Sequence, residues 1–347
     1  MTPNLFGVSF GLAGLAGSWR AAAHITSAPG WVAGALAVAA TAAWFAVGAA
    51  WVAQLVGRPR SLSGELHDPV QGPFVSLLPI VGMLLALDLY PHERFTGQVL
   101  FGVFAAATLL LTAWLTGQWI TDRVDLDALH PGYFLPTVAG ALIAAQGAGQ
   151  IGWPGPARAL FGIGLLFWLL LGPLILARPI IRPPLPAALT PTLAIHVAPP
   201  ALVGTAYLAL TAGRFDALTW AMAGFTALMM LVQLRLIPLY RRAPFGPGWW
   251  SFTFAYAAAA TFALRWIAHE HPPGAAAWAW TVLGLITVII GAIAARTVLA
   301  LARGQFLPHP ATTAQGPPRP RPEHDHAGGG YSAVADTTDG TTARRDG

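Results

Sequence analysis

Residues 190–212 read TPTLAIHVAPPALVGTAYLALTA, and residues 216–239, after a short polar turn, read DALTWAMAGFTALMMLVQLRLIPL. Both segments are apolar and long enough to cross a bilayer, which takes about 20 helical residues. The first is built of small residues and is interrupted by Pro199 and Pro200, whereas the second carries bulky side chains. A small, kinked helix suits the lining of a bundle, and a bulky helix suits its lipid-facing side. The pair therefore predicts a helical hairpin with one inner and one outer helix.

The same contrast recurs along the chain. We expect spans at residues 4–24, 30–56, 70–90, 95–119, 131–150, 156–177, 190–212, 216–239, 248–268 and 275–302. Glycines or prolines interrupt odd-numbered spans, as at Gly7, Gly11, Pro79 and Pro136, and the later even-numbered spans are bulky. The Ala-rich second span is the exception. The pattern predicts an all-α integral membrane protein, with ten transmembrane helices forming five hairpins around a central pore at 1–303. A disordered cytoplasmic tail is expected at 304–347, where apolar residues are scarce.

Composition excludes several classes of protein. The 347 residues are 55% hydrophobic and 10% charged, against about 25% charged in soluble domains. The absence of cysteine excludes disulfides and thiolate metal sites. The net charge of +5 comes from arginines dispersed at helix ends, so we expect no nucleic-acid partner. No HExxH motif or facing histidine pair is visible, and we predict no catalytic residue, metal or cofactor; an intramembrane enzyme or haem protein would need such a pair.

The arginines also suggest an orientation, because cytoplasmic loops are enriched in basic residues. We place both termini in the cytoplasm of a multi-pass protein of the bacterial inner membrane. The more basic, cytoplasmic face would hold Arg58, Arg60, Arg123, Arg178, Arg182, Arg241, Arg242 and Arg303. The opposite face would hold Arg20, Arg94, Arg158, Arg214 and Arg265.

Few polar groups occur within the spans, and charges at bilayer depth are costly. Arg20 and Asp88 close the first and third spans on the same predicted side. They form either an interfacial ion pair that locks two lining helices together or a charged pore mouth. His196 is either a hydrogen-bonded packing residue or a group that meets a passing anion or titrates with pH. Ser9 and Thr137 are further candidates for polar groups in a pore.

The prolines have a mechanical meaning. A proline inside a helix removes one backbone donor and pushes away the carbonyl four residues earlier, and in lipid that carbonyl must face protein or water. Pro79, Pro136, Pro199 and Pro200 therefore suggest kinked helices around a hydrated or protein-packed axis, although proline is also common in ordinary membrane bundles. The deep spans hold no glutamate or aspartate that would offset the desolvation of a cation. With arginines at the mouths, the composition favours a wide, weakly selective path for anions.

Aromatic residues are candidates for closing such a path. The segment Trp249-Trp-Ser-Phe-Thr-Phe254 opens the ninth span, and Ala255 to Ala260 are almost all small. A bulky ring beside small residues on a lining helix can plug a narrow pore. Ordinary aromatic packing gives the same spacing, so the spacing alone leaves both interpretations open.

Several motifs together resemble the tellurite-resistance/C4-dicarboxylate transporter family, which includes bacterial tellurite-resistance proteins, malate and sulfite permeases and plant slow anion channels. The resemblance covers about residues 4–302. The motifs are Leu5-Phe-Gly-Val-Ser-Phe-Gly-Leu-Ala-Gly-Leu-Ala, His67-Asp-Pro69, Phe134-Leu-Pro-Thr-Val-Ala139, Pro191-Thr-Leu-Ala-Ile-His-Val-Ala-Pro199 and Gly248-Trp-Trp-Ser-Phe-Thr-Phe254.

The resemblance implies a homotrimer in which each protomer has its own pore, lined by the odd-numbered helices and blocked by a phenylalanine on the ninth. That position matches Phe254, with Phe252 as the nearest rival. Ser9 and Ala255 stand where the family often carries prolines, which affects the expected pore profile. The predicted function is passage of small anions through a gated channel. The alternative is a proton-linked carrier of C4-dicarboxylate, sulfite or tellurite, in which His196 and the charges at the pore mouth would couple protons to transport.

Overall fold

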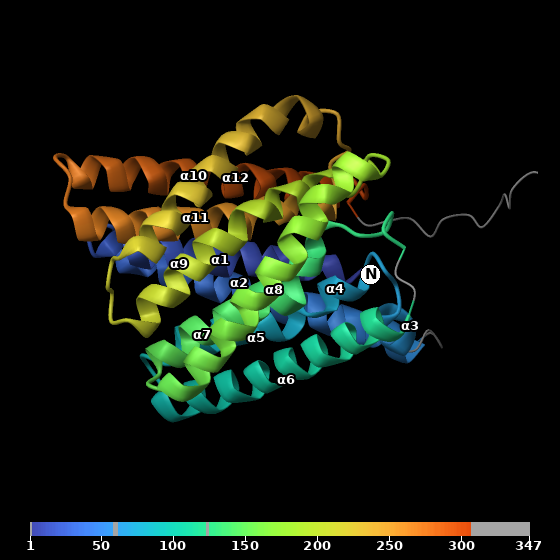
Figure 1. Ribbon diagram of the computed structural model, residues 1–347, viewed down its shortest axis with the longest axis horizontal. Helices are drawn as coiled ribbons and strands as arrows, with labels where there is room; N and C mark the ends of the chain where they lie inside the picture. The colour runs from blue at the N-terminus through green and yellow to red at the C-terminus, as the bar shows by residue number, and fades with distance from the viewer. Residues whose placement is uncertain (1, 58–61, 123–124, 307–347) are drawn as a thin grey trace, which may run out of the picture. The chain divides into compact units, whose positions relative to one another are not determined.

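The computed structural model describes residues 2–57, 62–122 and 125–306, and in these ranges the chain forms helices joined by short turns (Figure 1). Residues 307–347 of the predicted tail lie outside the described residues. Five helices, here called the inner helices, are α1 (Gly7–Ala23), α5 (Leu77–Leu89), α7 (Gly140–Gln150), α9 (Ala198–Leu210) and α11 (Ser251–Glu270). Five outer helices are α2 (Gly30–Gly57), α6 (Arg94–Thr121), α8 (Pro154–Ile181), α10 (Ala217–Tyr240) and α12 (Ala275–Ala302). Shorter elements are η1 (Pro3–Phe6), α3 (Leu62–Leu66), α4 (Gly72–Val75), η2 (Pro131–Tyr133), η3 (Leu135–Ala139), η4 (Thr190–Val197) and η5 (Pro247–Trp250).

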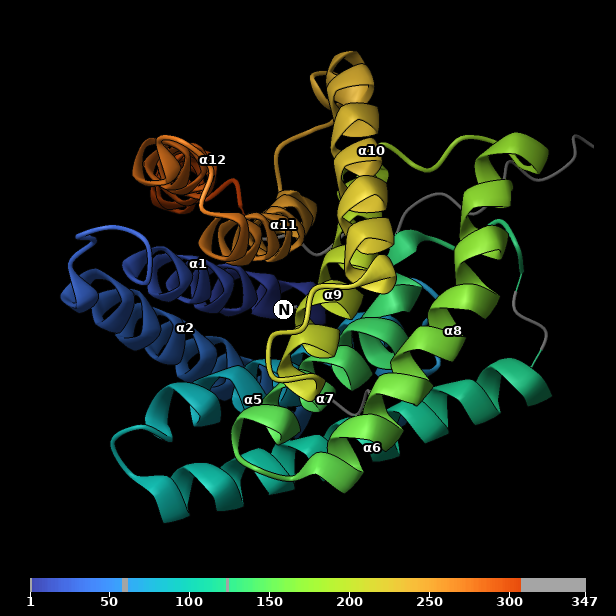
Figure 2. The same cartoon turned by 60° about the vertical axis from the view of Figure 1, so that its left-hand side comes forward.

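The inner helices form a closed ring. Each one packs against the next, in the order α1, α5, α7, α9, α11 and back to α1. Every outer helix packs against the inner helix that precedes it in the chain and also against the following member of the ring, so that it covers the groove between the two (Figure 2). The hairpin of one inner and one outer helix is therefore the repeating unit of the fold.

Burial follows this arrangement. Two inner segments, α4–α5 and η4–α9, are long and apolar enough to count as membrane spans. Within an apolar stretch of 18 residues in each, 67% and 72% of the residues are buried. In the five outer helices the buried share lies between 11% and 28%. The outer helix α2 has the lowest value, although its alanine-rich sequence resembles that of an inner helix. Alanine is as compatible with lipid as it is with close packing, so small size alone does not place a helix inside.

Within the described residues, seven helical segments are long and apolar enough to cross a membrane, and the fold is that of an all-α membrane protein. The other inner helices, α1, α7 and α11, are not among these seven. The helices α1 and α7 have only 17 and 11 residues, and α11 ends in the polar residues His269 and Glu270. A helix that its neighbours shield from lipid does not require strongly hydrophobic side chains. The number of ten spans therefore stays a prediction.

Each of the predicted prolines lies close to a break or a change of helix type at the start of an inner helix. Pro79 stands in the first turn of α5, just after the break at Ser76 that separates α4 from α5. Pro136 belongs to η3, a π-helical turn that leads into α7, and its carbonyl accepts a hydrogen bond from Thr112 Oγ1 at 2.6 Å. Pro199 and Pro200 begin α9 directly after the 3₁₀ helix η4. The missing proline N–H ends one hydrogen-bonding pattern and a different one follows.

Glycines allow α1 and α11 to approach closely. A Cβ atom at Gly11 would lie 2.6 Å from Thr253 Cβ, and one at Gly14 would lie 2.9 Å from Phe254 Cδ2. Ser18 Oγ, one turn further along α1, donates to the carbonyl of Ala257 at 3.1 Å. Small residues that bring helix backbones together are typical of membrane bundles, and here they place α1 directly beside Phe254.

Candidate functional site

The inner helices line two cavities. The smaller, of about 30 Å³, is lined at the N-terminal ends of the inner helices and by the short elements that precede them. The larger, of about 1230 Å³, is lined by the C-terminal parts of the same helices and by α2. All five inner helices therefore run in one direction, from the smaller cavity towards the larger. Two residues, Leu202 and Phe254, line both cavities.

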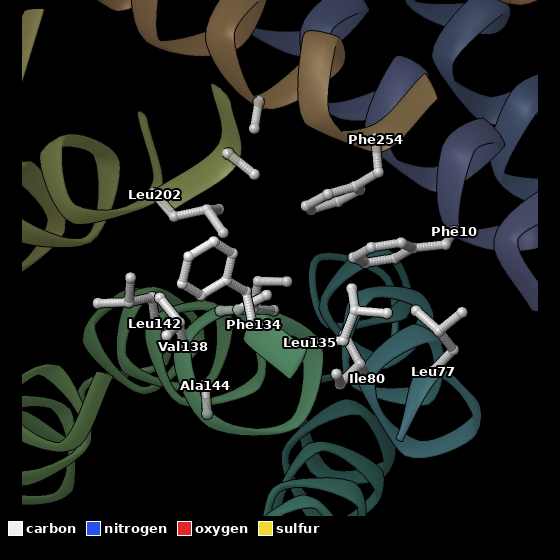
Figure 3. Close-up of a cluster of buried hydrophobic side chains, with 14 of the residues drawn as sticks. Phe10, Leu77, Ile80, Phe134, Leu135, Val138, Leu142, Ala144, Leu202 and Phe254 are labelled. Atoms are coloured by element: carbon white, nitrogen blue, oxygen red, sulfur yellow. The ribbon is translucent and has the colours of Figure 1, made fainter. Parts of the chain in front are cut away.

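Phe254 stands at the junction of the two cavities. Its ring stacks on that of Phe10 from α1, with ring centroids 3.5 Å apart and planes inclined by 11°. Figure 3 shows the two rings lying face to face, with Leu202 and Phe134 directed towards the same space. Phe254 and Phe10 are 8% and 5% exposed, so the rings occupy the axis of the bundle with little free space around them.

Phe252 lies elsewhere. Its ring packs against Tyr240, Trp249 and Tyr256, and it is not among the described lining residues of either cavity. Because successive helical residues are about 100° apart, positions 252 and 254 cannot face the same direction. The geometry thus separates the two predicted gate residues and brings only Phe254 to the axis.

Of the predicted proline positions, Pro199 lines the smaller cavity. Pro79, Pro136 and Pro200 are buried within the inner elements, away from the lining of both cavities. Each of the three lies at or just before the first turn of an inner helix.

The neutral polar candidates form hydrogen-bond contacts with backbone carbonyls three or four residues earlier in the chain. Ser9 Oγ donates to the carbonyl of Phe6 at 3.0 Å, and Thr137 Oγ1 donates to that of Tyr133 at 3.1 Å. His196 Nδ1 lies 3.1 Å from the carbonyl of Leu193, and its ring meets Phe134 edge-on. Its other nitrogen, Nε2, is buried with no hydrogen-bond partner among the described residues. None of these three side chains lines either cavity.

Arg20 and Asp88 do come together. A guanidinium nitrogen of Arg20 lies 2.5 Å from Asp88 Oδ1, which joins α1 to α5 at the rim of the larger cavity. The ion pair expected from the sequence is present and forms part of the cavity wall, and its role as a pore mouth stays a prediction. Asp88 is the one carboxylate among the described lining residues of the two cavities.

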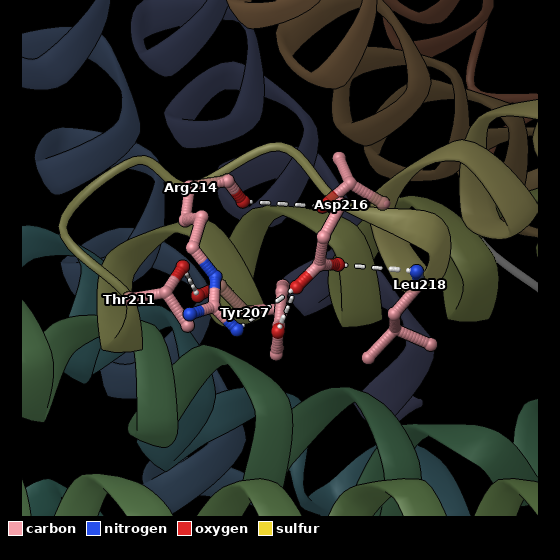
Figure 4. A network of polar contacts seen from close by, with 6 residues as sticks. Tyr207, Thr211, Arg214, Asp216 and Leu218 are labelled. Carbon is pink, nitrogen blue, oxygen red and sulfur yellow. Dashed lines mark hydrogen bonds and ion pairs between the residues drawn. The ribbon is translucent and has the colours of Figure 1, made fainter.

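A polar network holds the loop between α9 and α10 at the edge of the larger cavity, which Gly213 and Phe215 line (Figure 4). Tyr207 Oη donates to Asp216 Oδ2 at 2.5 Å, and Arg214 pairs with the same oxygen at 3.2 Å. Asp216 also caps α10 by accepting a hydrogen bond from the backbone N–H of Leu218 at 3.1 Å. The hydrogen bond from Tyr207 is the main reason why the pKa of Asp216 lies below its usual value.

His130 braces the wall of the smaller cavity. Its ring is fully buried and stacks on Phe74, a lining residue, at 5.6 Å. The backbone N–H of Gly132 donates to Nδ1 at 3.1 Å, so the ring proton is on Nε2, which donates to the carbonyl of Val70 at 3.1 Å. Burial lowers the pKa of His130 to about 4. The neutral ring thus ties the loop before η2 to the loop before α4.

Three residues of this site were not predicted from the sequence. Phe10 lies within a predicted lining helix, but only the fold shows that it faces Phe254. Leu202 has no distinguishing sequence feature. Arg265, which the sequence assigned only to the face opposite the more basic one, lines the larger cavity. Its spacing of 11 residues from Phe254, close to three helical turns, was a usable signal.

No group of three or more histidine, cysteine, aspartate or glutamate side chains that would hold a metal ion is present in the part of the chain that the structure describes. The histidines of the tail, His324 and His326, lie outside it.

Comparison with known proteins gives a family. The sequence profile described as "Voltage-dependent anion channel" (SLAC1) matches residues 1–298. The tellurite resistance protein TehA homolog of Haemophilus influenzae is 26% identical over 302 residues, which cover 87% of this chain and 91% of that protein. The S-type anion channel SLAH1 of Arabidopsis thaliana is 30% identical over 183 residues, 51% of this chain and 47% of that channel. The guard cell S-type anion channel SLAC1 of the same plant is 25% identical over 217 residues, 60% of this chain and 38% of that channel.

Proposed function

This chain belongs to the SLAC1 family of voltage-dependent anion channels, and we propose that it passes small anions through its ring of inner helices, with Phe254 as the gate. It is a multi-pass membrane protein, and the predicted family resemblance is confirmed by the comparisons. The observation that carries the proposal is the position of Phe254, which lines both cavities and stacks on Phe10 between them. In this arrangement the aromatic ring blocks the route from one cavity to the other.

The charge of the lining supports an anion as the permeating species. A cation path offsets the loss of hydration with carboxylates or a filter of carbonyl oxygens. Here the one carboxylate among the described lining residues, Asp88, is already paired with Arg20. Among the described lining residues an anion meets no uncompensated negative side chain, whereas a cation finds no free carboxylate to replace its water.

A proton-linked carrier has less support. His196, the residue that the sequence assigns to proton coupling, does not line either cavity, and the histidines that do line the larger one were not assigned to this role. The charges at the predicted mouth, Arg20 and Asp88, are held together in an ion pair. Transport that saturates and follows a pH gradient would nevertheless favour the carrier.

The gate is tested by expressing wild type and Phe254→Ala in oocytes and recording currents in a chloride gradient. Removal of the ring is expected to raise the anion current strongly above the wild-type level. The matched control is Phe252→Ala, which removes the same ring from the same helix away from both cavities and is expected to leave the current unchanged. A background current from Phe254→Ala at normal surface expression contradicts the gating proposal.

The resemblance also supports a homotrimer in the bacterial inner membrane, and the distribution of arginines supports cytoplasmic termini. Chemical cross-linking in native membranes tests the first, with a trimer-sized band as the expected product. Accessibility of tags fused to the two ends tests the second.

A further inference from the structure

The larger cavity contains one charged side chain that nothing compensates. Its described lining includes three strongly charged residues, Arg20, Asp88 and Arg265. The first two neutralise each other in their ion pair. Among the described residues, no hydrogen bond, ion pair or ring contact engages Arg265. The cavity wall therefore carries a net positive charge, located on α11.

Arg265 lies on the same face of α11 as the gate. Eleven residues of an α-helix complete about three turns and advance roughly 16 Å. Between Phe254 and Arg265, the residues Ala258 and Thr261 continue the same stripe, and all four line the larger cavity. An anion at Arg265 thus lies on the route to the Phe254 ring, about three turns away from it.

Neutral donors share the same cavity. Gln146 and Gln150, one turn apart on α7, line it, and no described residue accepts a hydrogen bond from their carboxamides. A guanidinium is always charged and presents several N–H donors without any acceptor. Together these side chains provide donors and positive charge, which suit an anion and repel a cation.

We propose that Arg265 holds a small inorganic anion in the larger cavity and so concentrates anions on one side of the gate. This inference rests on the proposed function for its role in transport, but the binding itself does not require conduction. A unit charge about 4 Å from an anion in bulk water raises the local anion concentration about fivefold. The effect is screened at high salt, where the Debye length falls to about 3 Å at 1 M.

The conduction test changes the charge at one position within an already folded protein. Because the chain has no cysteine, Arg265→Cys in a Phe254→Ala background provides a single thiol for methanethiosulfonate reagents. At 10 mM chloride, loss of the arginine is expected to lower conductance about three- to fivefold. A trimethylammonium reagent should restore it, and a sulfonate reagent should lower it further. At 1 M chloride the differences should nearly vanish.

The matched control is Arg158→Cys, because Arg158 is an exposed arginine of α8 that lines neither cavity. Both reagents should leave its conductance unchanged. Mass spectrometry checks that labelling of Arg265→Cys is complete. If the two reagents then give this variant the same conductance at 10 mM chloride, the proposed role of Arg265 is wrong.

A binding test separates this inference from the proposed function. Exchange of gluconate for 100 mM nitrate at constant ionic strength should raise the melting temperature of detergent-purified wild type by about 2–4 °C, for a dissociation constant near 10 mM. Arg265→Lys and Arg158→Gln should keep the shift, and Arg265→Gln should lose it. If nitrate still raises the melting temperature of Arg265→Gln, the proposed anion site is wrong. If Phe254→Ala gives no current while nitrate raises the melting temperature as expected, the proposed channel function is wrong and the proposed anion site at Arg265 still holds.

Discussion

The stacked pair of Phe10 and Phe254 predicts that a residue on α1 controls the gate on α11. The two rings lie 3.5 Å apart and nearly parallel, inclined by 11°. Such a pair contributes about 0.5–1.5 kcal/mol beyond the burial of its surface. If the proposed gate opens by moving the Phe254 ring off Phe10, Phe10→Ala removes this contribution from the closed arrangement only. The equilibrium between closed and open forms should therefore shift towards open by about 2- to 13-fold.

A double-mutant cycle measures this coupling. Wild type, Phe10→Ala, Phe254→Ala and the double variant are expressed in oocytes, and chloride currents are normalised to surface protein. Phe10→Ala is expected to give a current between those of wild type and Phe254→Ala. The double variant should conduct about as well as Phe254→Ala, since Phe10 has no ring left to stabilise. Phe252→Ala again serves as the control for removing a buried ring.

Two results would refute this reasoning. If Phe10→Ala gives wild-type currents while Phe254→Ala conducts, the stack does not hold the gate closed. If the effects of the two substitutions multiply in the double variant, the residues act independently and the contact has no energetic role in gating.

Further predictions concern the packing and the pH response. Gly11→Ala should lower the melting temperature in detergent, because its Cβ would lie 2.6 Å from Thr253 Cβ and overpacking costs about 1–3 kcal/mol. Gly17→Ala is the control and should leave the melting temperature nearly unchanged, because its Cβ would meet no atom within 4 Å. Equal decreases in the melting temperatures of the two variants would disprove this explanation. Since the pKa of His130 falls to about 4 in the folded protein from 6.5, the unfolded chain binds the proton first on acidification. The free energy of unfolding should thus be largest above pH 6.5 and decrease by up to about 3 kcal/mol towards pH 4. His130→Gln should flatten that dependence in denaturation measured across this range, and an unchanged slope would contradict it.

Much of the helical arrangement follows from the sequence. The bulky spans predicted at 95–119, 156–177 and 275–302 correspond to α6, α8 and α12 within a few residues at most ends, because a long apolar segment has few alternatives in a membrane. The interruptions at Pro79, Pro136 and Pro199 were also predictable, since every proline ring removes a backbone hydrogen-bond donor. The π-helical turn at Pro136 was not predicted, and the hydroxyl that donates to the Pro136 carbonyl comes from Thr112 on another helix.

The site was only partly predictable. Phe254 was selected by resemblance to a family, and spacing alone did not separate it from Phe252. Its partner Phe10 lies at the other end of the chain, and nothing in either local sequence encodes their contact. The C-terminal part of α12 shows the same limit. Arg296 lies over the rings of Phe245 and Trp249, 4.5 and 5.7 Å from their centroids, a contact that depends on how α12 is placed beside the loop before η5.

The close packing of α1 against α11 has a consequence for biosynthesis. Ser18 and Ala257, which are hydrogen-bonded, are separated by 239 residues. At about 5–20 residues per second, a ribosome needs roughly 10–50 s to make the intervening chain. During that time the glycine-rich face of α1 is inserted without its final neighbour. Closure of the ring is thus among the last events of assembly, and a nascent chain arrested before α11 would expose the surface that a finished protein keeps covered.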